Sequence, residues 1–171
     1  MYSRRYTPER ITELAPDEIF VFGSNLAGVH GGCAARLAYQ RFGAVWGEGV
    51  GHHGQTYAIP TMQGGVDTIK PYVDDFIRYA KAHPNLTFLV TRIGCGIAGF
   101  RDKDIAPLFK NALKVDNIIL PEAFVDCLAE WLIESQRPTV YGPPEWFDRR
   151  KETIPQPKER GFLRNLFKKK K

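Results

Sequence analysis

The chain has 171 residues, the usual length of a single domain with one continuous core. Its 43% hydrophobic and 25% charged residues are typical of a globular protein, and no apolar run approaches the roughly 20 residues that span a bilayer. The net charge of +5 does not indicate a nucleic-acid-binding domain: residues 149–171 hold ten basic and two acidic residues, a balance of +8, which leaves −3 for residues 1–148.

Cysteine usage and the N-terminal sequence both predict a cytoplasmic protein. Cys33, Cys95 and Cys127 are widely spaced and contain no CxxC pair, which fits neither a disulfide framework nor a zinc site. Residues 1–20 have no apolar core of signal-peptide type. We therefore expect no secretion, no membrane span, no metal and no other cofactor.

The first predicted strand and helix are joined by glycines. EIFVFGSN (residues 18–25) is an apolar strand that stops at a Gly-Ser-Asn turn. Apolar Cys33, Leu37 and Phe42, with alanines between them, then predict a helix that ends at Gly43.

The same alternation continues along the chain. QTYAIPTM (55–62) and LTFLVTRI (86–93) are strand patterns, and the three- and four-residue apolar spacing of residues 69–84 predicts an amphipathic helix between them. Residues 104–113 predict a further helix and 117–124 a last strand or an extended segment. Residues 124–136 fit one more amphipathic helix.

This order predicts an α/β fold, a three-layer α/β/α sandwich around a mostly parallel mixed sheet. We expect one domain over residues 1–135. Residues 136–171, with five prolines and the run Lys168–Lys171, predict an extended basic arm. Two alternatives stay open for the arm: weak, salt-sensitive contact with nucleic acid or an anionic membrane face, or a solvated tail.

Two glycine-rich loops, in residues 22–35 and 93–100, each follow a predicted strand and precede a predicted helix. Glycines let backbone amides approach an anion, and a helix N-terminus adds partial positive charge. One such loop is an ordinary turn of an α/β chain, but two at the same end of a sheet favour a diphosphate ligand. The absence of GxxxxGK[ST] argues against a P-loop nucleotidase.

Several side chains near these loops have two interpretations. His30 is either a surface histidine or a group that holds a phosphate or moves a proton. Asn25 either caps its turn or binds a ribose hydroxyl, which we favour. Adjacent His52 and His53 rarely bind one metal ion, and we expect them in a mobile glycine-rich connection that could cover a cleft.

Three further residues flank the second loop. Arg92 and Asp102 either form an ion pair, contact a ligand or are simply solvated. Cys95 is either a thiolate nucleophile or a small packing residue, and we favour packing.

Three segments of the chain resemble the sequence motifs of one known protein family. SNLAGVHGGCAARLAYQRFGA (24–44) resembles the macro-domain signature in which an Asn precedes a glycine-rich loop and a helix. VTRIGCGIAGFRDKDIAPLF (90–109) resembles that family's second signature, and TYAIPT (56–61) is similar to the F-P-T strand of its DNA and terminal ADP-ribose glycohydrolases. The resemblance covers about residues 18 to 115 and implies a fold that binds ADP-ribose or a related nucleotide diphosphate sugar.

The resemblance also implies a cleft between the two loops. The first loop would lie near the distal ribose and diphosphate, the second would wrap the diphosphate, and Thr61 would lie at the mouth. Asn25 and His30 are the candidates for activating a water. The residues implied to contact the ligand are Gly23, Ser24, Asn25, Gly28, Gly31, Gly32, Cys33, Thr61, Gly94, Cys95, Gly96, Ile97, Ala98, Gly99 and Phe100.

Departures from the family pattern leave the function open. Where the glycohydrolases have a lysine after the F-P-T strand and an aspartate in the second loop, this chain has Met62 or Gln63, and Ala98. The family's adenine-binding aspartate also has no clear counterpart. The chain is therefore either a hydrolase of ADP-ribosyl linkages, a binding module that senses or sequesters the nucleotide without turnover, or a phage-type accessory protein with a degraded cleft.

Overall fold

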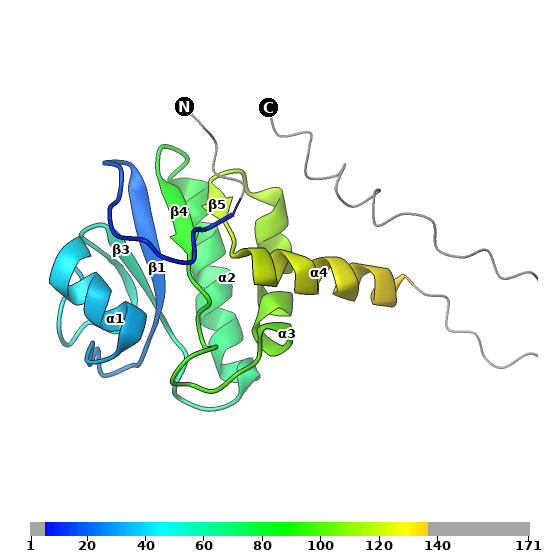
Figure 1. The fold of residues 1–171 in the computed structure, drawn as a ribbon, viewed down its shortest axis with the longest axis horizontal. Helices are drawn as coiled ribbons and strands as arrows, with labels where there is room; N and C mark the ends of the chain where they lie inside the picture. The colour runs from blue at the N-terminus through cyan, green and yellow to red at the C-terminus, as the bar shows by residue number, and fades with distance from the viewer. Residues whose placement is uncertain (1–5, 137–171) are drawn as a thin grey trace, which may run out of the picture. The chain divides into compact units, whose positions relative to one another are not determined.

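The computed structural model describes residues 6–136, and its strands form one five-stranded sheet (Figure 1). The strands are β1 Glu18–Ser24, β2 Gly51–His53, β3 Thr56–Pro60, β4 Thr87–Val90 and β5 Ile118–Ile119. Their order is β2-β3-β1-β4-β5, and only β2 is antiparallel to its neighbour. The predicted α/β class with a mostly parallel, mixed sheet is confirmed.

The helices fall close to the predicted positions, with two departures from α geometry. They are α1 Cys33–Leu37, continued by the π-helical turn η1 Ala38–Phe42; α2 Val66–Ala82; α3 Asp102–Ile105, continued by the 3-10 helix η2 Ala106–Lys114; and α4 Glu122–Ser135. Gly43, with a φ of 86°, ends η1 in the left-handed conformation that glycine favours. Pro107 lies at the start of η2, where its missing N–H removes a hydrogen-bond donor at the point where the α-helix gives way to 3-10 geometry.

One face of the sheet packs against α1 and η1. Because side chains alternate along a strand, Phe20 and Phe22 of β1 point to this face together. Phe20 contacts Phe42 with 5.2 Å between ring centroids, and Ala35 and Ala38 fill the space beside them. The small alanines bring the helix close to the central strand.

The other face packs against α2, η2 and the first part of α4. Phe76 of α2 lies 5.1 Å from Tyr57 and 5.6 Å from Phe88, ring centroid to ring centroid. Phe109 and Phe124 continue this aromatic layer at 5.7 Å. Helices therefore cover both faces, with α1 and α2 on opposite sides of β1 and β4 in Figure 1, an arrangement compatible with the predicted sandwich.

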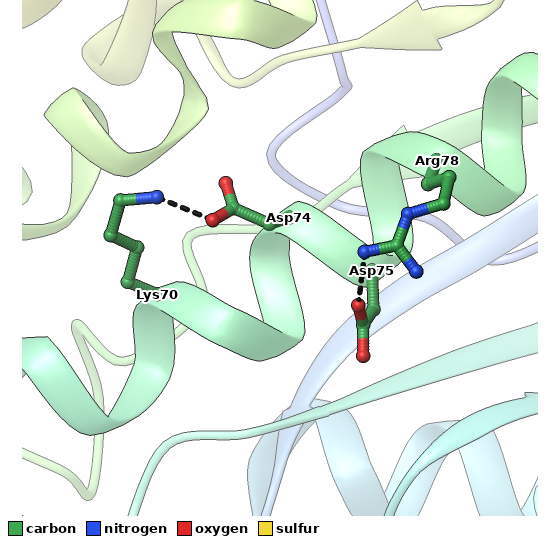
Figure 2. Close-up of polar contacts among 4 residues, drawn as sticks. All are labelled: Lys70, Asp74, Asp75 and Arg78. Carbon is green, nitrogen blue, oxygen red and sulfur yellow. Dashed lines mark hydrogen bonds and ion pairs between the residues drawn. The ribbon is translucent and has the colours of Figure 1, made fainter.

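The outer face of α2 carries charged pairs. Lys70 pairs with Asp74 and Arg78 with Asp75, one helical turn apart in each case (Figure 2). Such exposed pairs contribute a few tenths of a kcal/mol each. The amphipathic pattern of α2 is thus explained by a buried apolar face and a solvated charged one, and no residue of α2 lines either cavity described below.

The structure corrects the expectation of a mobile connection at His52 and His53. Both residues belong to β2, in which His52 lies opposite Tyr57 of β3. The hydroxyl of Tyr79 on α2 lies 2.9 Å from His52 Nδ1, and burial lowers the pKa of this imidazole. These ties hold the segment at the sheet edge, so it is not a lid.

The chain divides into two compact units, Met1–Leu128 and Ala129–Lys171. Of the second unit, the structure describes residues 129–136, which form the end of α4 and the residue after it. The predicted basic arm, except Gln136, and its contact with nucleic acid lie outside the described residues. Between residues 6 and 136, no helix is long and apolar enough to cross a membrane.

Candidate functional site

A cavity lies where the connections of two neighbouring strands diverge. In the order β2-β3-β1-β4-β5, the chain leaves β1 towards β2 and β3 at one edge of the sheet. It leaves the neighbouring strand β4 towards β5 at the other edge. Open α/β sheets bind ligands at such switch points, at the carboxyl ends of the strands. The cavity here has a volume of about 260 Å³, and we call it the switch-point cleft. Its lining residues are Gly23, Ser24, Asn25, Val29, Gly32, Cys33, Ala34, Ala35, Thr61, Met62, Thr91, Arg92, Ile93, Gly94, Gly96, Ile97 and Ala98.

Asn25 shapes the first loop with its side chain. Its Nδ2 donates to the Val29 carbonyl at 2.8 Å, and its Oδ1 accepts from the Val29 amide at 3.0 Å. A carboxamide has two N–H donors and two lone pairs on oxygen, so one of each remains for a ligand. The structure therefore shows the turn-capping role of Asn25, while its contact with ribose stays a prediction.

The segment of residues 45–50 is hydrogen-bonded to this loop and fixes its position. Gly28, with a φ of 63°, accepts a hydrogen bond from the Gly47 amide at 3.0 Å, and Ser24 Oγ donates to the Gly49 carbonyl. A Cβ on Gly28 would lie 2.3 Å from the Gly47 carbonyl carbon. Gly28 is thus required for backbone packing, and it does not line the switch-point cleft.

His30 lies in the core, which corrects its expected catalytic role. Its side chain is 1% exposed and packs edge-on against Phe22, with 5.3 Å between centroids. Nε2 lies 3.0 Å from the Val45 carbonyl oxygen and 3.2 Å from that of Glu48. Since carbonyls only accept, Nε2 carries the hydrogen and the imidazole fastens the 45–48 segment. Its buried Nδ1 has no partner among the described residues.

The first wall of the cleft presents unpaired amides. The first backbone donor bonded at this end of α1 is Arg36, whose N–H reaches the Gly32 carbonyl at 3.1 Å. No described residue accepts a hydrogen bond from the amides of Cys33, Ala34 or Ala35, as is general for a first helical turn. The three residues that carry these amides line the cleft.

The second wall is a tight turn after β4. The Gly99 amide donates to the Gly96 carbonyl at 2.9 Å, and Gly99 has a φ of 78°. Within the described part of the chain, nothing accepts from the amides of Gly96, Ile97 or Ala98, which line the cleft. A Cβ on Gly32 would lie 2.6 Å from Ile97 Cδ1, so the two walls meet at that point.

Cys95 lies outside the lining of the cleft. Burial, followed by the neighbouring carboxylate of Asp102, raises the pKa of its thiol to about 12. The thiol therefore stays protonated at neutral pH and is no nucleophile. This agrees with the packing role that we favoured.

The cleft contains one charged side chain, that of Arg92. No carboxylate, lysine or histidine of the described residues lines it. Thr61 lines the cleft, but it is 3% exposed and its amide donates to the Ser24 carbonyl at 2.9 Å, so it is buried and does not lie at the mouth as expected. The lining residues described thus include one cationic side chain and no carboxylate or imidazole that could act as a general base.

A second cavity of about 1110 Å³, which we call the adjoining cavity, shares Cys33, Ala34, Thr91 and Arg92 with the cleft. It extends between the N-terminal segment, the outer side of α1 and η1, and the start of α4. Its polar side chains include Glu9, Gln40, Arg41 and Glu122. The two cavities together offer room for a ligand larger than a diphosphate.

The structure brings most of the predicted contact residues together. Those that line the cleft are Gly23, Ser24, Asn25, Gly32, Cys33, Thr61, Gly94, Gly96, Ile97 and Ala98. Those that lie outside its lining are Gly28, Gly31, Cys95, Gly99 and Phe100. Lining residues that the sequence did not single out as contacts are Val29, Ala34, Ala35, Met62, Thr91 and Ile93. Arg92, for which an ion pair with Asp102 and contact with a ligand were both considered, forms the ion pair and lines the cleft.

Comparison with protein-family models, with curated proteins and with solved structures finds no match for the chain.

Proposed function

We propose that the chain is a macro-like domain that binds ADP-ribose or a related nucleotide diphosphate sugar in the switch-point cleft, without turnover. The observation that carries this proposal is the pair of facing walls with unpaired backbone amides, at Cys33–Ala35 and Gly96–Ala98. Backbone amides converging from two sides suit the several oxygens of a diphosphate. The segments that resemble the macro-domain motifs form these two walls.

The size and charge of the site support the same ligand class. The cleft of about 260 Å³ accommodates a diphosphate with part of a sugar, and the adjoining cavity of about 1110 Å³ accommodates a nucleoside. The positive charge of Arg92, with no carboxylate lining the cleft, favours an anion.

Binding without turnover is favoured over hydrolysis because the cleft offers no group to activate water. His30 is buried beneath the 45–48 segment, and Asn25 offers only a neutral carboxamide, which is too weak a base to take a proton from water. Incubation with an ADP-ribosylated substrate tests this directly. Release of free ADP-ribose by the purified chain would replace the binding module with the hydrolase.

Calorimetric titration with ADP-ribose tests the ligand, and Gly96→Glu tests the site. A Cβ on Gly96 meets no atom within 4 Å, so the variant should fold. Its carboxylate would repel a diphosphate by about 4 kcal/mol at 4 Å in a partly solvated site, and we expect at least a ~100-fold loss of affinity.

Gly65→Glu is the matched control, since Gly65 is equally open and lies outside the cleft. We expect it to bind ADP-ribose as the wild type does. Absence of binding to the wild type at millimolar ligand would refute the proposed function, and full affinity in Gly96→Glu would move the site elsewhere.

A further inference from the structure

Arg92 stands where the two cavities join. It lies two residues after β4 and lines both the switch-point cleft and the adjoining cavity. Its Nε donates to Asp102 Oδ1 at 2.9 Å and its Nη2 to Oδ2 at 2.6 Å, a two-pronged contact along one edge of the guanidinium. The side chain remains 58% exposed, while that of Asp102 is 22% exposed.

The rest of the guanidinium makes no hydrogen bond to a described residue, although the charge of Glu9 in the adjoining cavity, after that of Asp102, also raises the pKa of Arg92. Arginine has five N–H donors, of which two bind Asp102, and no described residue accepts from the remaining three. A planar guanidinium can hold a carboxylate along one edge and a phosphate along the other. Asp102 thus fixes the orientation of Arg92 and leaves donors available to a second anion.

Asp102 is itself held in place. It begins α3, and the hydrogen bonds from Arg92, and to a lesser extent from the Cys95 thiol, hold the pKa of its carboxyl below the usual range. It therefore stays ionised at neutral pH. A fixed, ionised carboxylate restricts the rotamers of Arg92, so less side-chain entropy is lost when a ligand binds.

We propose that Arg92 selects ligands that carry a phosphate at the junction of the two cavities, and that Asp102 is the positioning residue that presents it. This inference rests on the proposed function, because it assigns the charge selectivity of the same site. It predicts that phosphate-bearing ligands are favoured over the corresponding nucleoside through this one side chain.

A nearby pair provides the contrast. Arg101 contacts Asp104 with the same kind of two-pronged geometry, at 2.9 and 3.1 Å, but neither residue lines either cavity. Arg101→Gln therefore removes an equivalent exposed arginine and ion pair that lies outside the lining of both cavities.

The test is calorimetric titration of the full chain with ADP-ribose and with adenosine, together with thermal shift in inorganic pyrophosphate. We expect Arg92→Gln to lower ADP-ribose affinity roughly 10- to 100-fold, the value of a hydrogen bond to a charged group, and to abolish the pyrophosphate shift. Adenosine affinity should not change. Arg101→Gln should match the wild type with every probe.

Asp102→Asn distinguishes the positioning of Arg92 by Asp102 from attraction of the ligand by the net charge of the site. It makes the cleft more positive by one unit but releases Arg92, so positioning predicts weaker ADP-ribose binding and simple attraction predicts stronger binding. Arg92→Lys keeps the positive charge but loses the planar guanidinium with its parallel N–H donors. Its affinity for ADP-ribose should lie between those of the wild type and Arg92→Gln.

The outcomes are distinct for the two proposals. If the wild type responds to pyrophosphate but not to ADP-ribose, the proposed function fails and Arg92→Gln still decides the inference. Equal affinities of Arg92→Gln and the wild type overturn the inference while the proposed function stands. Stronger binding by Asp102→Asn overturns the positioning role. A wild type that responds to neither probe refutes both.

Discussion

Gly49 supports the first wall of the cleft by lacking a side chain, and Gly49→Ala measures how much that matters. A Cβ at this position would lie 1.9 Å from the Asn25 carbonyl oxygen and 3.0 Å from the Gly28 amide nitrogen. Ordinary contacts of a Cβ begin near 3.4 Å, so the backbone must shift by more than an ångström. Overpacking of this kind costs about 1–3 kcal/mol. Loss of the hydrogen bond from Ser24 to the Gly49 carbonyl adds about 1 kcal/mol.

We therefore expect Gly49→Ala to lower the free energy of unfolding by about 2–4 kcal/mol, measured by urea denaturation. Two control variants isolate the causes. Gly47→Ala meets no atom within 4 Å but has a φ of 91°, so it should lose only about 1–2 kcal/mol, the penalty of left-handed backbone. Gly31→Ala, which is open and free of that strain, should change stability by less than about 0.5 kcal/mol. A loss in Gly49→Ala no larger than that in Gly47→Ala would refute the steric argument.

Two other predictions concern buried His30 and partly buried Cys95. His30→Ala should destabilise the fold by about 2–4 kcal/mol in denaturant titration, because it leaves a cavity and two carbonyls without their donor; unchanged stability would contradict the buried position of the imidazole. Cys95 should be alkylated by iodoacetamide at pH 8 far more slowly than exposed Cys33, because its raised pKa, about 12, keeps the thiol protonated until strongly alkaline pH. Peptide mapping of the labelled chain measures both rates, and comparable rates would show that Cys95 is neither buried nor shifted.

Local sequence patterns were sufficient for the central elements. The apolar run of β1, the three- and four-residue spacing in α2 and the glycine that ends η1 are each determined within a few neighbouring residues. The positions of the two glycine loops at one sheet edge followed from the alternation of strands and helices. The cytoplasmic location, the ligand and the role of the basic arm stay predictions.

The remaining features depend on contacts between distant residues. β2 has only three residues, and its sequence, GHH, does not predict a strand. It is a strand because it pairs with β3. The burial of His30 results from the 45–48 segment, which folds back over it fifteen or more positions later. Arg92 enters the site because Asp102 orients it from across the second loop. No local pattern could have indicated the first two outcomes, whereas the position of Arg92 just after β4 made it a possible ligand contact in the sequence.

The unpaired amides of the two walls have a thermodynamic consequence for the free protein. Donors without a protein acceptor are satisfied only by solvent or ligand, so a bound anion adds hydrogen bonds that the folded chain alone lacks. A ligand that binds only the folded state at 100 times its dissociation constant stabilises that state by about 2.7 kcal/mol. On the proposed function, the melting temperature of the chain therefore reports anion binding, and a collection of phosphorylated metabolites can be ranked without an assumed substrate or an activity assay.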